Sequence, residues 1–220
     1  MSEYIFITGT NTNVGKTHFG ISLIKYLNKY NQCLAFKPIE TGCKESKSKL
    51  VPADSSKYYK LTKNSISLEQ INPYRFIDPV SPYLAIRKGK RKIYLDNYYK
   101  KLKIISKKNN TILIEGAGGA FSPFALDGLN IDFMKLVKSK NILVVKDELG
   151  CIGSALSHFY SFKKYRVPLD LIILNNHKKN KMDNLNEIKK YIDIPIYAYG
   201  KSPKDNIKCL GAIKDRLLSK

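Results

Sequence analysis

The segment at residues 9–17 limits the possible folds of this chain more than any other feature. It reads Gly-Thr-Asn-Thr-Asn-Val-Gly-Lys-Thr, follows a short apolar run at 4–8, and precedes an amphipathic stretch at 16–30. A loop of this composition between a strand and a helix presents backbone N–H groups, a lysine and a hydroxyl to phosphates. The spacing is unusual, because Gly9 lies six positions before Gly15 rather than five. A turn that only caps a helix is the alternative, but strand, Gly-Lys-Thr and helix coincide, so the segment predicts a phosphate-binding loop.

Beyond this loop, short apolar runs alternate with longer amphipathic stretches. Several of the runs are apolar at every position, which is typical of parallel strands covered by helices on both faces. The predicted strands lie at residues 4–8, 33–37, 111–115, 142–146, 169–174 and 195–199. The predicted helices lie at residues 16–30, 54–62, 94–108, 131–139, 152–165, 181–192 and 205–218. This alternation predicts a doubly wound α/β fold of the P-loop NTPase type, with a mostly parallel sheet and helices on both faces.

The stretch at 39–93 is less regular than the rest of the chain. It contains Pro52, Pro73, Pro79 and Pro82, and prolines interrupt helices. We therefore expect a long excursion from the sheet that contains one or two helices. Because no linker-like or repeated segment divides the 220 residues, the sequence predicts a single domain over residues 1–220.

The formal net charge of +21 is the most unusual feature of the composition. Such a charge is compatible with a nucleic-acid-binding module or with attachment to an anionic membrane surface. However, the basic residues are scattered as pairs rather than gathered in one stripe, and no nucleic-acid-binding motif is present. We interpret the charge as a compositional bias and expect neither a nucleic acid nor a membrane as partner.

The cysteines and the N-terminus bear on location. The four cysteines, Cys33, Cys43, Cys151 and Cys209, form no CxxC pair, and residues 1–8 resemble a first strand rather than a signal peptide. No apolar run approaches the roughly 18 residues that span a bilayer. These features predict a cytoplasmic protein with free thiols.

Three charged residues stand where the predicted strands end or a helix begins. Lys37 follows the second strand, where it provides a fixed cation for an anionic substrate, although a lone lysine there is more often a surface residue. Asp54 begins a helix, so capping is its default role and metal binding the alternative. Glu115 ends the third recognisable strand, which is the usual place of a second magnesium contact in P-loop enzymes.

Together these motifs resemble the dethiobiotin synthetases. The resemblance covers residues 4 to about 176, and its motifs occur in one order along the chain. They are the loop at 9–17, Lys37-Pro38 with Thr41-Gly42, Asp54, Asn72-Pro73-Tyr74, Ser81-Pro82, Glu115-Gly-Ala-Gly-Gly and Leu149-Gly-Cys-Ile. The ordered set is specific, although each piece alone is weak.

The resemblance implies a ligase that closes a cyclic urea on 7,8-diaminononanoate. Such enzymes use carbon dioxide and ATP, proceed through a carbamate and a carbamic-phosphoric anhydride, and release dethiobiotin, ADP and phosphate. It further implies that Thr17, Asp54 and Glu115 bind Mg2+, and that Lys16, Lys37 and Thr12 are catalytic. The implied nucleotide-binding residues are Asn13, Val14, Gly15, Lys16, Thr17, His18, Glu115 and Asn175. The implied substrate-binding residues are Lys37, Thr41, Gly116, Ala117, Gly118, Gly119, Gly150 and Cys151.

The resemblance also implies a homodimer with the substrate site at its interface. The helix start at Gly150 and Cys151 would come from the partner subunit and receive the carboxylate of the substrate. We interpret the Cys151 thiol as a packing residue, although a helix start can lower a thiol pKa. This chain departs from the family pattern, because Asn11 and Asn13 stand where acids are common. Asn175 matches a family asparagine that faces the purine, but Asn176-His177-Lys178 lacks the aspartate of a guanine-specific motif, so weak selectivity for the nucleobase is expected.

A partitioning or membrane-cycling ATPase of the MinD/ParA kind is the alternative function. Those proteins share the predicted fold but carry a signature lysine early in the loop, where this chain has Thr10 and Asn11. The apolar residues of the C-terminal stretch are compatible with a membrane-surface helix, or more commonly with packing on the same domain. They are Ile207, Leu210, Ile213, Leu217 and Leu218.

Overall fold

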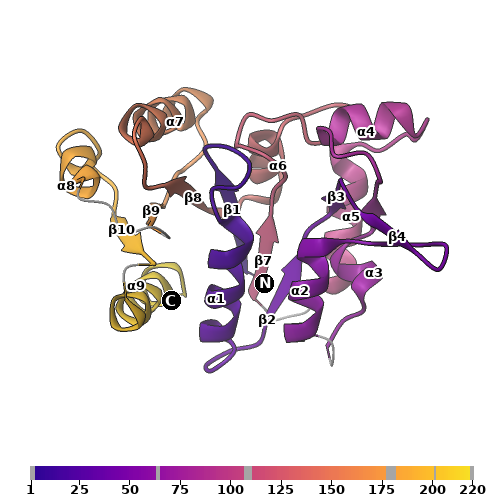
Figure 1. Cartoon of the computed structure of the whole chain (residues 1–220), viewed down its shortest axis with the longest axis horizontal. Coiled ribbons are helices and arrows are strands. Elements are labelled where there is room, and N and C mark those ends of the chain that lie inside the picture. Colours follow the sequence, from indigo (N-terminus) through magenta and orange to yellow (C-terminus); the bar gives the residue numbers. More distant parts are fainter. Residues whose placement is uncertain (1–2, 63–64, 107–110, 177–181, 201, 219–220) are drawn as a thin grey trace.

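A six-stranded parallel sheet lies at the centre of the computed structural model (Figure 1), which describes residues 3–62, 65–106, 111–176, 182–200 and 202–218. Its strand order is β10-β9-β8-β1-β7-β2, and every pairing in it is parallel. The strands are β1 (Glu3–Gly9), β2 (Cys33–Phe36), β7 (Thr111–Glu115), β8 (Lys140–Lys146), β9 (Leu171–Asn175) and β10 (Ile196–Tyr199). All six predicted strands are present, with ends that differ by up to two residues.

Helices cover both faces of this sheet, so the predicted doubly wound fold is confirmed. The chain leaves β1 toward β2 in one direction and later crosses from β7 to β8 in the other. Because parallel crossovers are right-handed, the connecting helices then fall on opposite faces. Helix α1 contacts α2 and α9, while α7 contacts α8. The bounds are α1 (Lys16–Leu27), α2 (Ala53–Thr62), α5 (Leu95–Ile105), α6 (Asn130–Val137), α7 (Cys151–Tyr165), α8 (Asn184–Lys189) and α9 (Pro203–Leu218).

The core consists of the apolar strands and one side of each long helix. Every residue of β7 is buried, and β1 buries Ile5, Phe6 and Ile7 completely. In α1 the buried positions Phe19, Leu23 and Leu27 recur every four residues, which turns one helix face to the sheet. Burial of strands on both faces accounts for their uninterrupted apolar sequences.

The excursion at 39–93 contains more structure than the sequence predicts. It has three helices, so the expectation of one or two was wrong: α2, α3 (Leu68–Ile71) and α4 (Pro82–Lys88). The prediction took the prolines as interruptions, but Pro82 is the first residue of α4. The N–H at this position has no partner within a helix, so proline is tolerated there. Two small sheets complete the region, a parallel pair of β3 (Ile39–Glu40) with β6 (Tyr74–Arg75) and a hairpin of β4 (Lys44–Ser46) with β5 (Lys49–Val51).

The C-terminal helix α9 packs on its own domain. Leu210, Ile213 and Leu217 are buried, whereas Ile207 is exposed and Leu218 is partly buried. Most of the apolar side that the alternative function needed at a membrane surface is therefore already covered by protein. In the part of the chain that the structure describes, no helix is long and apolar enough to cross a bilayer. The four cysteines are free and buried.

The register of the sheet brings distant residues to one edge. Ile7 pairs with Glu115, and Gly9 at the end of β1 pairs with Val144. Ligands of doubly wound sheets bind at the carboxyl ends of the strands. The loop that follows β1 and the acid that ends β7 meet at this edge.

Candidate functional site

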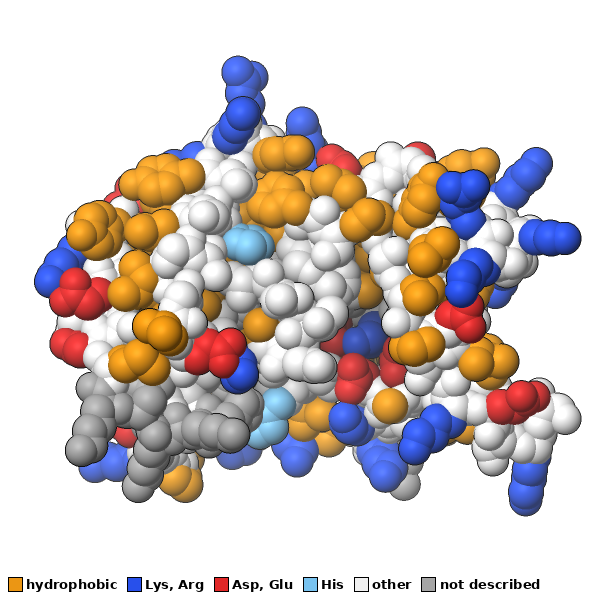
Figure 2. Space-filling view, turned by 45° about the horizontal axis from the view of Figure 1, so that its top comes forward, with side chains coloured by type: hydrophobic (Ala, Val, Ile, Leu, Met, Phe, Trp, Pro, Cys, Tyr) orange, Lys and Arg blue, Asp and Glu red, His pale blue; other side chains and the backbone are white. Residues whose placement is uncertain are grey.

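A cavity of about 790 Å³ opens at the carboxyl edge of the sheet. Figure 2 shows acidic and basic side chains together in a recess of the surface. Thirteen of the predicted site residues line the cavity. They are Thr12, Asn13, Gly15, Lys16, Thr17, His18, Lys37, Thr41, Asp54, Glu115, Gly116, Ala117 and Gly118. The structure thus brings together residues that lie more than 100 positions apart in the sequence.

The loop at 9–17 has the conformation that a phosphate-binding loop requires. Gly15 precedes the first turn of α1 with a φ of 96°, which favours glycine, and its carbonyl accepts from the N–H of Phe19 at 3.0 Å. Thr10 is tied to β8, because its N–H donates to the carbonyl of Val144 at 3.1 Å. The loop is therefore held on both sides, and its N–H groups at the start of α1 are available to an anion.

Lys16 extends back over this loop. Its Nζ donates to the carbonyl oxygen of Asn11 at 2.8 Å, and only 8% of the residue is exposed. Burial lowers the pKa of Lys16 to about 8, and the charge of Lys37 adds to this effect, while Glu115 and Asp54 partly oppose it. The loop therefore holds a lysine whose positive charge costs free energy until an anion approaches.

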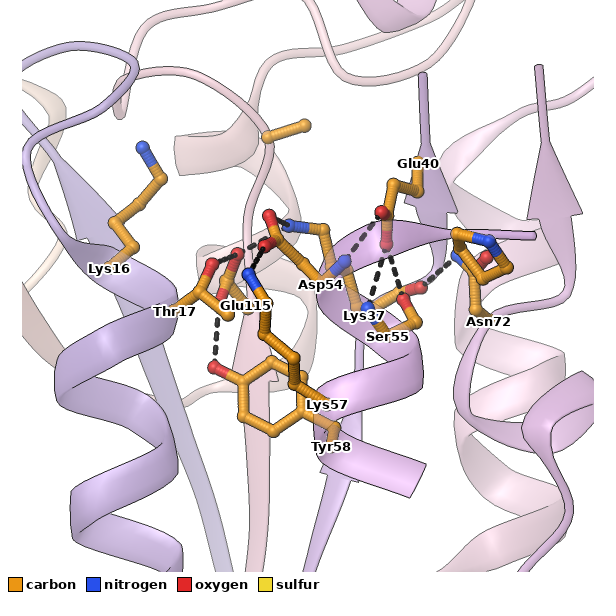
Figure 3. Close-up of polar contacts among 12 residues, drawn as sticks. Lys16, Thr17, Lys37, Glu40, Asp54, Ser55, Lys57, Tyr58, Asn72 and Glu115 are labelled. Atoms are coloured by element: carbon orange, nitrogen blue, oxygen red, sulfur yellow. Dashed lines mark hydrogen bonds and ion pairs between the residues drawn. The ribbon is translucent and has the colours of Figure 1, made fainter. Parts of the chain in front are cut away.

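A cluster of charged side chains lies beside the loop (Figure 3). Lys37 donates to Oε1 of Glu115 and, at 3.2 Å, to Oδ2 of Asp54. The hydroxyl of Thr17 donates to the same Oε1 at 3.0 Å, and the hydroxyl of Tyr58 donates to Oε2 at 2.5 Å. Glu115, which is almost fully buried, thus joins side chains from α1, α2 and the end of β2.

The charges in this cluster stabilise one another. Burial lowers the pKa of Lys37, but Glu115 and then Asp54 more than offset it, so the pKa lies above its usual range. Burial raises the pKa of Asp54, but Lys37 and Lys57 outweigh it and bring it to about 2. Lys37 therefore stays positive and Asp54 negative at neutral pH.

The side chains of Thr17, Asp54 and Glu115 suit a hard divalent cation. They provide a hydroxyl and two carboxylates, and oxygen atoms are the ligands that Mg2+ prefers. Among the described residues no group of three His, Cys, Asp or Glu side chains could hold a metal. A cation at this place therefore depends on Thr17 and on oxygen atoms of a ligand as well, as in nucleotide sites where phosphates complete the coordination.

Asp54 is not the cap of its helix, contrary to its default interpretation. Helix α2 begins one residue earlier, at Ala53, and the N–H of Asp54 donates to Oε1 of Glu40 at 2.8 Å. Because another residue caps the helix, the carboxylate of Asp54 faces Lys37 and Lys57 instead.

The glycine-rich segment at 116–119, after β7, partly lines the cavity and partly packs against the phosphate-binding loop. Gly116, Ala117 and Gly118 line the cavity. Gly119 packs against the phosphate-binding loop, since a Cβ there would lie 3.2 Å from the carbonyl oxygen of Gly9. Asn130, which the sequence did not single out, holds this segment through its Nδ2, which donates to the carbonyls of Ala117 and Gly119 at 2.9 Å.

Gly150 and Cys151 lie on the other side of the phosphate-binding loop. They line a second cavity of about 240 Å³, together with Val14, and of the described residues only Thr12 and Asn13 border both cavities. Within one chain they are thus separated from the other predicted substrate-binding residues. Burial raises the pKa of the Cys151 thiol, which agrees with its interpretation as a packing residue.

Asn175, the last residue of β9, contacts the phosphate-binding loop. Its Nδ2 donates to the carbonyl of Val14 at 2.7 Å, and its Oδ1 is buried without a partner among the described residues. His18 is exposed at the start of α1, with its ring 5.8 Å from that of Tyr199. Residues 177 and 178, on which the expected weak base selectivity rests, lie outside the described residues, so that expectation stays a prediction.

Tyr58 reaches Glu115 only because Gly20 leaves room for its ring. A Cβ at Gly20 would lie 2.2 Å from the hydroxyl oxygen of Tyr58. We expect Gly20→Ala to destabilise the fold, because the overpacking costs about 1–3 kcal/mol against a gain of roughly 1 kcal/mol in helix propensity. In a Tyr58→Phe background the shortest remaining contact of this Cβ is 3.2 Å, to Cζ of the ring, so the same change is expected to destabilise the fold less. Urea unfolding of the four variants of this cycle measures the coupling, and additive effects would contradict the contact.

Sequence comparisons point to one group of enzymes. A family model described as an AAA domain matches residues 3–204. The chain is 37% identical over 157 residues to an ATP-dependent dethiobiotin synthetase of Buchnera aphidicola, with 71% of this chain and 69% of that protein covered. It is 31% identical over 198 residues to an ATP-dependent dethiobiotin synthetase of Vesicomyosocius okutanii, with 90% of both covered.

Comparisons of structure show the fold alone. The septum site-determining protein MinD of Pyrococcus horikoshii, solved with Mg-ADP, superposes with a TM-score of 0.55 at 16% identity, over 94% of this chain and 86% of that one. A ParA family ATPase of Chlorobium tepidum superposes with a TM-score of 0.56 at 15% identity, over 99% and 89%. At such identities the likeness confirms the P-loop NTPase architecture and does not separate the functions found on it.

Proposed function

This chain belongs to the dethiobiotin synthetase family, which makes it an ATP-dependent ligase, and we propose that it closes the cyclic urea of dethiobiotin on 7,8-diaminononanoate. One observation carries the proposal. Lys16, Lys37, Thr17, Asp54 and Glu115 converge on one cavity at the carboxyl edge of the sheet. This arrangement suits the transfer of a phosphoryl group to an anionic acceptor, which requires alignment and charge neutralisation more than covalent chemistry.

The nucleotide is held by the loop and the start of α1. Backbone N–H groups and the helix dipole face the phosphates, and Lys16 moves from the carbonyl of Asn11 to the β- and γ-phosphates. A magnesium ion held by Thr17, Asp54 and Glu115 would neutralise the phosphate oxygens during transfer. Asn175 keeps the loop in place through the carbonyl of Val14.

The first step joins the diamine to carbon dioxide. The nitrogen of one amine attacks the carbon, loses a proton and becomes a carbamate, which needs no nucleophile from the protein. Lys37 remains protonated at neutral pH because Glu115 and Asp54 surround it. It therefore offers a fixed positive charge to the carbamate beside the γ-phosphate.

Two further steps complete the ring. A carbamate oxygen attacks the γ-phosphorus and ADP leaves, which gives the carbamic-phosphoric anhydride. The second amine then attacks the carbonyl carbon, the C–O bond breaks, and phosphate leaves with the anhydride oxygen. The segment formed by Gly116, Ala117 and Gly118, together with Thr41, lines the same cavity as Lys37, and we propose that the diamine lies along these residues.

The dimer is a part of this proposal. Gly150 and Cys151 line a different cavity from Gly116 and Gly118 in one chain. They serve the same substrate only if the helix start of one subunit faces the cavity of the other. A homodimer with the site at its interface, located in the cytoplasm, is therefore what we expect. Sedimentation of the purified chain tests the dimer.

The direct test of the activity is release of ADP by the purified chain. We expect release that depends on both diaminononanoate and bicarbonate, together with formation of dethiobiotin detected by mass spectrometry. Omission of either substrate is the control. Equal ADP release without the diamine, and no dethiobiotin, would show that the chain has another activity.

Glu115→Gln is expected to raise the magnesium requirement sharply. The substitution keeps the size of the side chain but removes a negative charge from the proposed cation site, so we expect at least a tenfold higher half-saturating Mg2+ concentration. Titration of turnover with Mg2+ at saturating ATP measures this shift. Asp132→Asn is the matched control, because the Asp132 carboxylate accepts from the N–H of Leu129 at the start of its own helix α6 and does not line the cavity. An unchanged requirement in Glu115→Gln would remove Glu115 from the metal site.

Nucleotide affinity is expected to fall as the pH rises above 8. Lys16 has a pKa of about 8 without ligand because burial penalises its charge. A bound polyphosphate stabilises the protonated form, so binding takes up a proton at high pH and the affinity falls by up to about tenfold per pH unit. The phosphates themselves are fully ionised there, since their last pKa is about 6. Calorimetry in buffers of different ionisation enthalpy counts the proton, and Lys16→Met is expected to remove this dependence.

A further inference from the structure

The first turn of α2 sets the position of two side chains in the charged cluster. Asp54 is the second residue of this helix, and Tyr58 follows one turn later. Asp54 contacts Lys37, and Tyr58 contacts Glu115. A shift of this turn would therefore move partners of both Lys37 and Glu115 at once.

The residue that caps α2 comes from another part of the chain. Pro52, which precedes the helix, has no side-chain acceptor for the free N–H groups of the first turn. Glu40 supplies both of its oxygens instead. Oε1 accepts from the N–H of Asp54 at 2.8 Å, while Oε2 accepts from the N–H of Ser55 at 3.0 Å and from its hydroxyl at 2.6 Å. Figure 3 shows Glu40 above the start of this helix.

Glu40 is itself fixed on both sides. It lies in β3, paired with Arg75 in β6, and its carbonyl oxygen accepts from the N–H of Phe76 at 3.0 Å. Only 6% of the residue is exposed. A carboxylate at the N-terminus of a helix is favoured by the helix dipole, and its hydrogen bonds are of the strong, charge-assisted kind. The contact thus ties a rigid strand to the helix that carries Asp54.

We propose that Glu40 is a positioning residue for the cation site: its carboxylate on β3 holds the first turn of α2 so that Asp54 and Tyr58 face Lys37 and Glu115. The inference rests on the proposed role of Asp54 as a cation ligand. Glu40 also lines the cavity, so contact with the diamine is the competing role. The geometry favours positioning, because both carboxylate oxygens are already engaged by α2.

Cation binding in Glu40 variants tests this role without relying on turnover. We compare Glu40→Ala, Glu40→Gln, Asp54→Asn and Ser56→Ala by calorimetric titration of Mg2+ into the complex with ADP. Ser56 is the matched control, because it lies in the same turn but contacts Pro52 rather than Glu40. Outer partners of metal ligands typically change metal affinity by about 10–100-fold. We expect at least a tenfold loss in Glu40→Ala, a smaller loss in Glu40→Gln, which keeps one acceptor, and none in Ser56→Ala.

A second readout follows the helix itself. Hydrogen exchange of the Asp54 and Ser55 amides is expected to accelerate in Glu40→Ala and not in Ser56→Ala. The KM for the diamine is expected to stay within about twofold when Mg2+ is saturating, since the cation site and not the substrate is disturbed.

The outcomes are distinguishable from failure of the proposed function. Loss of Mg2+ affinity in Asp54→Asn but wild-type affinity in Glu40→Ala would overturn the positioning role alone. Wild-type affinity in Asp54→Asn would overturn the role of Asp54 on which it rests. A raised KM for the diamine with unchanged Mg2+ affinity in Glu40→Ala would identify a substrate contact instead. Should Glu40→Ala not fold, wild-type Mg2+ affinity in Glu40→Gln is the overturning result.

Discussion

Replacing Lys37 with alanine is expected to abolish ring closure, with a loss of turnover of at least about a thousandfold. Lys37 is buried, stays positively charged, and contacts two carboxylates in the cavity. Its removal takes away the fixed cation beside the proposed carbamate. The carbamate and the γ-phosphate are both negative, so they repel each other unless a cation lies between them. Among the described residues, Lys16 is the one other lysine that lines this cavity.

Lys37→Ala is also expected to strengthen the stabilisation of the fold by Mg2+, although it abolishes turnover. Without Lys37, the Glu115 and Asp54 carboxylates lie close together without a shared partner, which costs about 3–5 kcal/mol of stability. A divalent cation would relieve this repulsion. We therefore expect Mg2+ alone to raise the melting temperature of Lys37→Ala more than that of the wild type, although the variant is inactive.

Lys57→Ala is the control for Lys37→Ala. Lys57 also contacts Asp54, at 3.0 Å, but its side chain is more than half exposed. Loss of such a surface pair is expected to cost less than about 1 kcal/mol and to change turnover by only a few-fold. Thermal unfolding with and without Mg2+ and an assay of dethiobiotin measure both effects. If Lys37→Ala retains turnover within tenfold of the wild type, Lys37 does not act on the carbamate.

Replacing Lys16 with alanine is also expected to lower turnover by about a hundredfold to a thousandfold. The ammonium group is the cation nearest to the proposed phosphate path, because its Nζ contacts the carbonyl of Asn11 within the loop. The uncatalysed steps of the reaction, such as carbamate formation in solution, are not affected by this change.

The stability of Lys16→Ala distinguishes a functional role from a structural one. Burial lowers the pKa of Lys16, so the charged lysine contributes unfavourably to folding below pH 8 in the absence of a ligand. This penalty disappears as the pH rises from about 8 to the unfolded value of 10.5, because the folded chain then releases its proton first. We thus expect little or no loss of melting temperature in the free variant at pH 7, but loss of the stabilisation that ADP provides. A large destabilisation of the free variant would indicate a structural lysine.

The local parts of the site are predictable from the sequence. A strand, a Gly-Lys-Thr loop and a helix adjoin in the sequence, so Lys16 and Thr17 follow from the pattern alone. Glu115 follows from its place at the end of an apolar strand, and the fold follows from the alternation of runs. These features depend on backbone periodicity and on neighbouring residues.

The contacts between distant elements are not predictable in this way. Glu40 caps a helix 13 residues further along the chain, and no motif links it to Ala53. Tyr58 reaches Glu115 because Gly20 lies on the adjacent helix, which only the packing of α1 against α2 reveals. Asn130 likewise organises the 116–119 segment from the start of α6. The prolines of the excursion were misread, because a proline that starts a helix looks the same in sequence as one that interrupts it.

The tip of the phosphate-binding loop borders two hollows at once, since Thr12 and Asn13 line the larger and the smaller cavity. Both residues are exposed, so the tip of the loop separates the two cavities without being part of the core. A ligand bound in either cavity would therefore contact residues that also line the other cavity, so the two sites share one short stretch of backbone.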